Sequence, residues 1–582
     1  MGTFVPASSL ARAAGSSGGR VTAGPPLDYR KVKGLTQPRY KTTRESVEVE
    51  TKDGINLYLE VVRPKAKGRF GVIIYSGPYH GTLQDRTGTR ILPGPVNAKG
   101  EHIGLSGYFA PRGYAVVFMD LRGTGRSEGC LDHLGPNDGA DLKRVVEWAA
   151  KQKWSNGRVG MTGHSYVGST PMLAAAQNPR GLATIVPSAG IARMYDHKFQ
   201  DGVPYFLQWA GPLFAYEMLA MDRHLPPGFN NPIGGSTGDN FGNDPQYFGC
   251  GWTTSTAVTG DAYLRGYQAQ WDVDRDFTNG ATKADIPVFI VHGVNDNAAR
   301  IAAADWFNDR GGRRGDKAWI GQWDHGSGRY PNSRTCPQSA TATCENDQWT
   351  LALHAWFDKH LLGRNVDTGP AAEVFLNNGA VFTADQWPPR PTQSLILYLN
   401  GDGGLAQKPG EEATASYNAA PSSSGSNSVA FESKPFKKET LIIGVPKLRL
   451  VASQTSPLLH INATLFDLKG NSADAIGRAN WAIQPELREG IDDPQPVIPT
   501  EVMEMNLESM AQAHLLEKGH TLRLVVSAQN PDKVPTLAAG GRVTVHLGKK
   551  GTRFSLPIIA NPVLYRDFCR GRDPSLSTAT CV

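Results

Sequence analysis

Gly163-His164-Ser165-Tyr166-Val167-Gly168 is the stretch of this 582-residue sequence that decides its fold. Residues 158–162, directly before it, form a short run typical of a buried strand, and residues 171–176 after it favour a helix. A serine on a tight strand-to-helix turn is a candidate nucleophile, because the following helix directs its positive end at the hydroxyl. The second glycine follows Ser165 by three residues rather than two, so a helix-capping serine is the alternative interpretation.

Strand and helix patterns alternate on both sides of this turn. Continuous apolar runs, typical of strands covered on both faces, are found at residues 71–75, 114–119, 183–187, 286–292 and 318–321. Residues 138–152 have the spacing of an amphipathic helix, and residues 45–63 alternate as in an antiparallel hairpin turned at Asp53-Gly54. The alternation predicts a mostly parallel, doubly wound α/β sheet.

Two regions depart from this pattern. Residues 189–284 are aromatic and irregular and are expected to form a helical cap over the active-site edge. Beyond residue 370, short β-rich runs separated by turn-rich segments predict a jelly-roll-like β-sandwich. The predicted domains are a disordered N-terminal segment (1–40), an α/β-hydrolase domain in two parts (41–188 and 285–369), the cap insertion (189–284) and the C-terminal β-sandwich (370–582).

Composition excludes several classes of protein. Hydrophobic residues make up 40% and charged residues 20% of the chain, and the net charge of +6 includes no basic block that would bind nucleic acid. No run approaches the roughly 18 to 20 apolar residues needed to span a membrane. The cysteines and histidines lack the spacing of a zinc site. A carbohydrate-binding or scaffolding protein built on the β-domain is the non-enzymatic alternative, and reaction with a fluorophosphonate would distinguish it from a serine enzyme.

The six cysteines predict disulfides and an oxidising compartment. The expected pairs are Cys336 with Cys344 and Cys569 with Cys581, which leaves Cys130 and Cys250 as the remaining possible pair. Disulfides of this kind indicate a secreted, extracellular protein. The first 26 residues are rich in Gly, Ala and Ser and lack the apolar segment of a signal peptide, so they are interpreted as a processed export remnant or an added end.

An acid and a histidine follow Ser165 in the order that a serine nucleophile requires. A serine hydroxyl needs a base, and the base needs an orienting carboxylate. Asp296 follows the apolar run that ends near residue 292, and His325 follows the run 318–321, so both are expected at the edge of the sheet. The rival residues fit less well: His292 within a strand, Asp324 directly beside His325, and His80 and His102 before the serine.

Sequence blocks beyond the turn point to a known family. They are residues 163–168 with a tyrosine directly after the serine, Asp120-x-Arg122-Gly123-x-Gly125-x-Ser127, Trp148 with residues 154–160, and Trp356-Phe357-Asp358. In these blocks the chain resembles the X-Pro dipeptidyl-peptidase and cocaine esterase family of α/β-hydrolases, over roughly residues 45 to 560. The resemblance also implies the C-terminal β-domain.

The resemblance implies roles for five residues. Ser165, Asp296 and His325 would be the catalytic triad, while the Tyr79 hydroxyl and the backbone N–H of Tyr166 would form the oxyanion hole. A buried tyrosine bonded to backbone is the structural alternative for Tyr79. The resemblance implies neither a metal nor an organic cofactor.

The expected activity is the release of X-Pro dipeptides from peptide N-termini. An esterase or acylase acting on small esters or amides is the alternative. The peptidase needs a carboxylate for the substrate ammonium and an apolar slot for proline. Cap residues that could serve are the acids Asp196, Asp201, Glu217 and Asp222 and the aromatic residues Tyr205, Phe206 and Trp209. A small peptide or ester is therefore the expected partner, without nucleic acid or membrane; the oligomeric state is open, a homodimer being one option.

Overall fold

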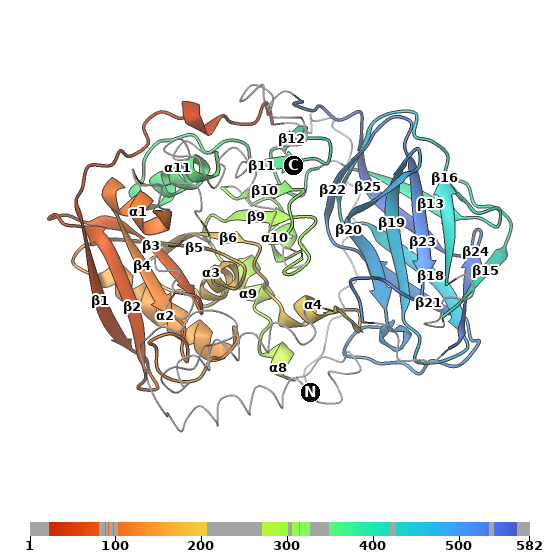
Figure 1. Cartoon of the computed structure of the whole chain (residues 1–582), viewed down its shortest axis with the longest axis horizontal. Helices are drawn as coiled ribbons and strands as arrows, with labels where there is room; N and C mark the ends of the chain where they lie inside the picture. Colours follow the sequence, from red (N-terminus) through yellow and green to blue (C-terminus); the bar gives the residue numbers. More distant parts are fainter. Residues whose placement is uncertain are drawn as a thin grey trace.

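The computed structural model describes residues 23–80, 88, 91, 97, 103–206, 270–300, 305–313, 315–325, 348–390, 392–419, 427–534 and 540–566. Within these residues, an α/β domain and a strand-rich C-terminal domain lie side by side (Figure 1). No helix in the described part of the chain is both long and apolar enough to cross a membrane.

The α/β domain is built on a ten-stranded sheet with the order β1-β2-β4-β3-β5-β6-β9-β10-β11-β12. The strands are β1 (Thr42–Glu50), β2 (Asn56–Pro64), β3 (Phe70–Gly77), β4 (Tyr114–Asp120), β5 (Ser155–His164), β6 (Leu182–Ser188), β9 (Phe289–Gly293), β10 (Lys317–Gly321), β11 (Ala372–Phe375) and β12 (Val381–Ala384). The pairings from β4 to β11 are parallel, whereas β1, β2 and β12 pair antiparallel. The predicted hairpin and doubly wound sheet are confirmed.

Helices cover both faces of this sheet. They are α1 (Gly104–Phe109), α2 (Pro136–Lys151), α3 (Tyr166–Ala176), α9 (Thr278–Lys283), α10 (Asp305–Asp309) and α11 (Gln348–Leu362), with short 3₁₀ helices η1 (Tyr29–Lys31) and η2 (Ala110–Arg112). Figure 1 shows α1 and α11 on one side of the sheet and α2 and α3 on the other. Covered strands explain the continuous apolar runs, since neither face of the sheet meets water.

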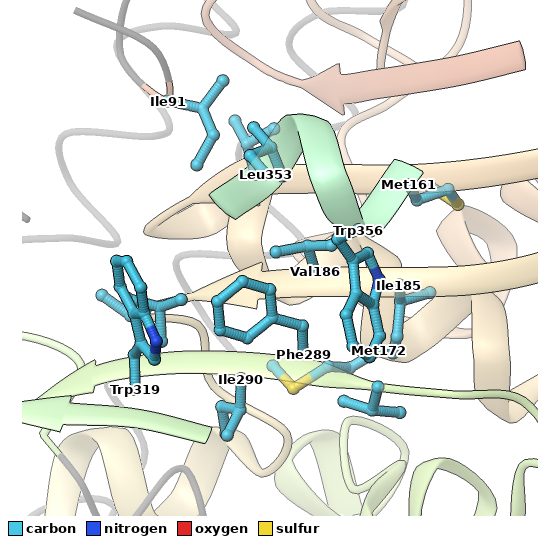
Figure 2. Packing of buried hydrophobic residues seen from close by; sticks show 14 of the residues in the cluster. Ile91, Met161, Met172, Ile185, Val186, Phe289, Ile290, Trp319, Leu353 and Trp356 are labelled. Carbon is cyan, nitrogen blue, oxygen red and sulfur yellow. The ribbon is translucent and has the colours of Figure 1, made fainter. Parts of the chain in front are cut away.

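Large aromatic side chains fill the space between α11 and the sheet. The ring of Phe289 on β9 lies 5.6 Å from Trp319 on β10 and 5.3 Å from Trp356 on α11 (Figure 2). All three side chains are buried. This packing anchors the two strands whose carboxyl ends lead to Asp296 and His325.

The C-terminal domain is confirmed as strand-rich. Its strands are β13 (Gln393–Leu399), β14 (Gly404–Ala406), β15 (Ala413–Asn418), β16 (Ser428–Ser433), β17 (Thr440–Gly444), β18 (Lys447–Gln454), β19 (Ile461–Lys469), β20 (Ser472–Ile483), β21 (Met503–Glu508), β22 (Gln512–Leu516), β23 (Thr521–Ser527), β24 (Arg542–Leu547) and β25 (Arg553–Ala560), with the 3₁₀ helix η6 (Pro485–Leu487). The central order is β15-β24-β18-β25-β13-β14-β16-β23-β19-β20. A jelly-roll winding stays a prediction.

The two domains share a hydrophobic core. Buried residues of β17 and β22, among them Leu441, Ile443 and Leu515, belong to the same apolar cluster as the α/β sheet. The C-terminal domain therefore packs directly against the catalytic domain.

The described part of the predicted cap consists of short elements. They are α4 (Met194–Lys198), β7 (Phe199–Gln200), β8 (Val203–Pro204) and α8 (Gln270–Val273), together with α9, which packs against α3 of the α/β domain. Residues 207–269 lie outside the described residues, so the helical character of most of the cap stays a prediction.

Two predicted boundaries are wrong. The segment predicted to be disordered is ordered from residue 23 to residue 40, because Tyr29 is buried and its hydroxyl lies within hydrogen-bond distance of the Glu373 carboxylate (3.0 Å) and the Thr368 carbonyl (2.9 Å). The α/β sheet continues past residue 369, because β11 pairs in parallel with β10 and β12 follows it. The second sheet begins only with β13.

Only one cysteine lies within the described residues. Cys130 is disulfide-bonded. Cys250, Cys336, Cys344, Cys569 and Cys581 lie outside the described residues, so the three pairings stay predictions.

Candidate active site

The turn that carries Ser165 has the geometry of a nucleophile elbow. Ser165 lies between β5 and α3 with φ +65° and ψ −129°, a backbone conformation that is rare outside glycine. Its N–H donates to the carbonyl of Ser188 at the end of β6 (3.0 Å). The neighbouring strand thus helps to hold the strained turn.

Close packing explains the two glycines around Ser165 and their spacing. A Cβ on Gly163 would lie 2.4 Å from the carbonyl oxygen of Val167, and a Cβ on Gly168 would lie 2.1 Å from that of Ser188. Both positions therefore exclude a side chain. The second glycine comes three residues after Ser165 because Gly168 is the point where the first turn of α3 meets the end of β6.

The structure brings Ser165, His325 and Asp296 together from the ends of three strands. Oγ of Ser165 lies 2.8 Å from Nε2 of His325. Nδ1 of His325 lies 2.9 Å from Oδ2 and 3.1 Å from Oδ1 of Asp296. Because a carboxylate only accepts, Nδ1 carries the ring proton, and Nε2 is left to accept the proton of the serine hydroxyl.

His325 and two backbone donors hold Asp296 in its ionised form. Its buried Oδ1 accepts hydrogen bonds from the N–H groups of Ala298 (2.8 Å) and Ala299 (2.9 Å). Burial by itself would raise the pKa of Asp296, but the charge and hydrogen bond of His325, with a smaller effect of His292, keep that pKa below its ordinary value. Asp296 can therefore orient His325 as a carboxylate.

Buried His292 and partly buried His164 flank these side chains. Burial lowers the pKa of His292 to about 4 and that of His164 to about 3. His292 lies within β9, with its Nε2 3.6 Å from Oδ2 of Asp296, and is the packed strand residue that the sequence predicts. The structural role of His164 was not predicted, and the only signal in the sequence is its place directly before Ser165.

The predicted oxyanion-hole residues lie at the start of α3 and after β3. Tyr166 is the first residue of α3, so its backbone N–H has no acceptor within the helix. Tyr79 is buried and follows the end of β3, which meets α3 closely: a Cβ on Gly77 would lie 2.4 Å from Cγ2 of Val167. Tyr79 is not among the described residues that line the pocket beside Ser165.

That pocket has a mainly apolar described wall. The apolar side chains are Leu134, Ala189, Ile191, Met194, Ala298 and Ala299. Polar residues of the wall are His133, Tyr166, Ser169, His197 and Lys198, in addition to Ser165 and His325.

Lys198 forms a buried ion pair with Asp272 (2.5 Å). No carboxylate lies among the described residues that line this pocket. No pattern in the sequence indicates that residues of α4 line this pocket.

The structure does not bring Tyr205 and Phe206 to the described pocket wall. The ring of Tyr205 is buried, with Cζ of Arg300 at 3.2 Å and Nζ of Lys533 at 3.4 Å from its centroid. Phe206 is 64% exposed, and its N–H donates to the carbonyl of Asp532 (2.9 Å). This segment therefore pairs with the C-terminal domain, and neither residue is among the described residues that line the pocket.

The predicted acids of the cap do not line the described wall either. Oδ1 of Asp196 lies 3.4 Å from Nη1 of Arg193, and the backbone carbonyl of Asp201 accepts from the N–H of Gln484 (2.9 Å). Trp209, Glu217 and Asp222 lie outside the described residues.

The sequence block from Asp120 to Ser127 stabilises the loop after β4. Arg122 forms a buried, bidentate ion pair with Asp141 (2.8 and 2.9 Å), and the Ser127 hydroxyl donates to the carbonyl of Asp120 (2.7 Å). These contacts hold the loop after β4 and involve no residue of the described pocket wall.

The fold and the Ser165–His325–Asp296 constellation define a serine hydrolase of the α/β-hydrolase class. The family described as X-Pro dipeptidyl-peptidase (S15 family) matches residues 53–327, and its C-terminal non-catalytic domain matches residues 364–562. The chain belongs to this family.

Individual relatives agree with this assignment. A putative Xaa-Pro dipeptidyl-peptidase of Streptomyces avermitilis is 26% identical over 88% of this chain and 83% of its own length. The cocaine esterase of Rhodococcus sp. is 24% identical over 83% of this chain and 90% of its own. A CocE/NonD family hydrolase from Staphylococcus aureus superposes with a TM-score of 0.69 at 19% identity, covering 92% of this chain and 99% of that one. This last similarity establishes the fold.

Proposed function

We propose that this enzyme releases X-Pro dipeptides from peptide N-termini through an acyl-enzyme on Ser165. His325 would take the proton of the Ser165 hydroxyl during attack on the scissile carbonyl and return it to the leaving amine. Asp296 would stabilise the imidazolium that forms on His325. Water would then hydrolyse the acyl-enzyme by the same route.

The observation that carries the peptidase proposal is the apolar pocket beside Ser165. Leu134, Ile191 and Met194 offer a wall of the kind that suits the rigid ring of proline. The family to which the chain belongs and the Streptomyces relative carry the description X-Pro dipeptidyl-peptidase, which supports the same substrate class.

An esterase of small acyl groups is the second candidate. The described pocket wall contains no carboxylate that would hold a substrate ammonium. The carboxylate of Asp272 already forms an ion pair with Lys198 of that wall. An ester needs no ammonium site, and a serine triad cleaves esters more readily than amides. The Rhodococcus relative is described as a cocaine esterase.

A comparison of three substrates separates the two functions. Ala-Pro-p-nitroanilide, its N-acetylated form and p-nitrophenyl butyrate would be assayed with the wild type and with Ser165→Ala, which should lose turnover of all three. The peptidase proposal expects kcat/KM for the free peptide to exceed that for the acetylated peptide by at least about tenfold, the order of one charge-assisted hydrogen bond. Equal rates on the two peptides, or activity on the ester alone, would establish the esterase instead.

We propose that Tyr79 and Tyr166 supply the oxyanion hole. Both follow strand ends that meet the N-terminus of α3. If the Tyr79 hydroxyl donates to the developing oxyanion, Tyr79→Phe should lower kcat by about 10²- to 10³-fold with little change in thermal unfolding. An unchanged kcat would leave Tyr79 as a packed tyrosine.

We further propose that the protein is secreted and that its cysteines pair as 336–344, 569–581 and 130–250. The disulfide-bonded state of Cys130 supports an oxidising compartment. Mass spectrometry of non-reduced peptides should find the three linkages. Free thiols at residues 336 and 344 would contradict the pairing and the export proposal.

A further inference from the structure

His164 connects three strand ends around the active site, and the proton transfers proposed above do not use it. It is the last residue of β5, directly before Ser165. Its Nε2 lies 3.0 Å from the backbone carbonyl oxygen of His325, and its Nδ1 lies 3.2 Å from Oγ of Ser188 at the end of β6. One side chain thus joins the strand of the nucleophile, the neighbouring strand and the loop of the base.

The two partners define the protonation of the His164 ring. A carbonyl oxygen only accepts, so Nε2 carries the proton and donates to His325. Nδ1 then accepts from the hydroxyl of Ser188. Burial, followed by the nearby His325, lowers the pKa of His164 to about 3, so both hydrogen bonds persist at neutral pH.

A neutral ring is compatible with the chemistry at His325. The two imidazole rings lie 5.0 Å apart, tilted by 35°. A charged neighbour at this distance would oppose the imidazolium that His325 becomes, whereas a neutral one does not. With its low pKa, His164 also does not compete for the proton of Ser165.

We propose that His164 is a positioning residue for the catalytic base. The His325 side chain is 21% exposed and follows a loop beyond the end of β10, so packing alone holds it less firmly than the buried Asp296. Asp296 orients the ring through Nδ1, and His164 anchors the backbone of the same residue. Together Asp296 and His164 keep Nε2 of His325 at hydrogen-bond distance from Oγ of Ser165. The inference rests on the proposed acyl transfer to Ser165 but not on peptide specificity.

Two variants of His164 test this role. His164→Phe keeps a planar ring and removes the donor, and it should lower kcat by roughly 10- to 100-fold with KM nearly unchanged, as expected for a misplaced catalytic group. The second-order rate of fluorophosphonate labelling should fall by a similar factor, because labelling also requires an activated Ser165. His164→Gln retains a side-chain N–H donor and should recover kcat to within about fivefold of the wild type.

A matched control comes from another partly buried histidine. Burial lowers the pKa of His360 on α11 to about 4, and this residue does not line the described pocket. His360→Phe should leave kcat and the labelling rate unchanged. All rates would be measured per folded molecule, on whichever peptide or ester the wild type hydrolyses.

The outcomes separate positioning from general stability. A wild-type kcat in His164→Phe would overturn the proposal, as would an equal loss in His164→Phe and His164→Gln. A lower unfolding temperature with unchanged kcat would assign His164 a purely structural role. A wild type that does not react with the fluorophosphonate would instead refute the proposed serine chemistry itself.

Discussion

The buried carboxylate of Asp296 meets two kinds of hydrogen-bond donor. His325 donates to it from one side, and the backbone N–H groups of Ala298 and Ala299 donate from its own loop. Each of these N–H groups requires a hydrogen-bond acceptor. The loop after β9 therefore favours an ionised acid at this residue, independent of where the substrate binds.

Asp296→Asn tests this arrangement at the scale of one residue. The amide group replaces one acceptor by a donor, so either His325 or the backbone N–H groups lose a partner, and the ring tautomer of His325 is no longer fixed. We expect kcat to fall by about 10³- to 10⁴-fold with a small change in KM. Steady-state kinetics would check this, and a variant that retains a tenth of the wild-type kcat would contradict it.

At the scale of elements, the junction of β5, α3 and β6 sets the geometry of the nucleophile. The carbonyl of Ser188 receives the N–H of Ser165 and also faces Gly168, with no room for a side chain between them. A substitution in the helix can therefore displace the serine through the neighbouring strand.

Gly168→Ala should disturb this junction. The new Cβ would lie 2.1 Å from the Ser188 carbonyl, so α3 or the end of β6 must move. We expect a loss of at least about 1 to 3 kcal/mol in the free energy of unfolding, together with reduced kcat. Gly540→Ala is the control, because among the described residues, its chain neighbours aside, no atom lies within 4 Å of the Cβ position at Gly540. Similar denaturation midpoints for the two variants would refute the argument.

At the scale of the whole molecule, the C-terminal domain contacts the loops that carry the acid and the base. Nε2 of Gln322, three residues before His325, donates to the carbonyl of Ala513 on β22 (2.6 Å). The backbone carbonyl of Gln322 accepts from the side chain of Asn295, directly before Asp296 (2.8 Å). One residue thus links the C-terminal domain to both loops.

Gln322→Leu should therefore reduce activity from outside the pocket. Loss of the amide leaves the Ala513 carbonyl without this donor and loosens the histidine loop, so we expect kcat to fall by roughly 3- to 30-fold with KM little changed. The exposed Gln393 on β13 offers the control Gln393→Leu, which should behave as the wild type. Identical kcat values for the two variants would contradict a role of the domain contact.

The stability of the whole molecule should depend on pH through its buried histidines. Burial, followed by the charge of Lys533, lowers the pKa of His460 to about 4, below the ordinary value near 6.5. The unfolded chain therefore binds a proton between about pH 6.5 and 4 that the folded chain does not, and folded stability falls as the pH is lowered through this range.

His460→Leu should flatten that dependence. The variant should lose less unfolding free energy between pH 6.5 and 4 than the wild type, by up to about 3 kcal/mol. Burial raises the pKa of Asp138 to about 8, so this residue increases the folded stability as the pH falls. Asp138 is present in the wild type and in the variant, so its contribution cancels in the difference between their unfolding free energies. Chemical denaturation at several pH values would measure the two slopes, and parallel slopes would exclude a contribution from His460.

The arrangement of the α/β strands and the three residues of the triad could be predicted from the sequence. Apolar runs record which strands are covered on both faces, and the parallel connections bring their carboxyl ends to one edge. Ser165, Asp296 and His325 each follow such a run, so their proximity follows from local patterns alone.

The pocket wall and the contacts between domains were decided only by the tertiary structure. As an aromatic residue, Tyr205 is a candidate for the apolar slot that holds proline. In the structure its ring lies between Arg300 and Lys533, because its segment pairs with the C-terminal domain. His164 acquires its partners only when the ends of β5, β6 and β10 meet. Periodicity records burial along one element, whereas the partner of a polar side chain depends on which distant segments meet it in the fold.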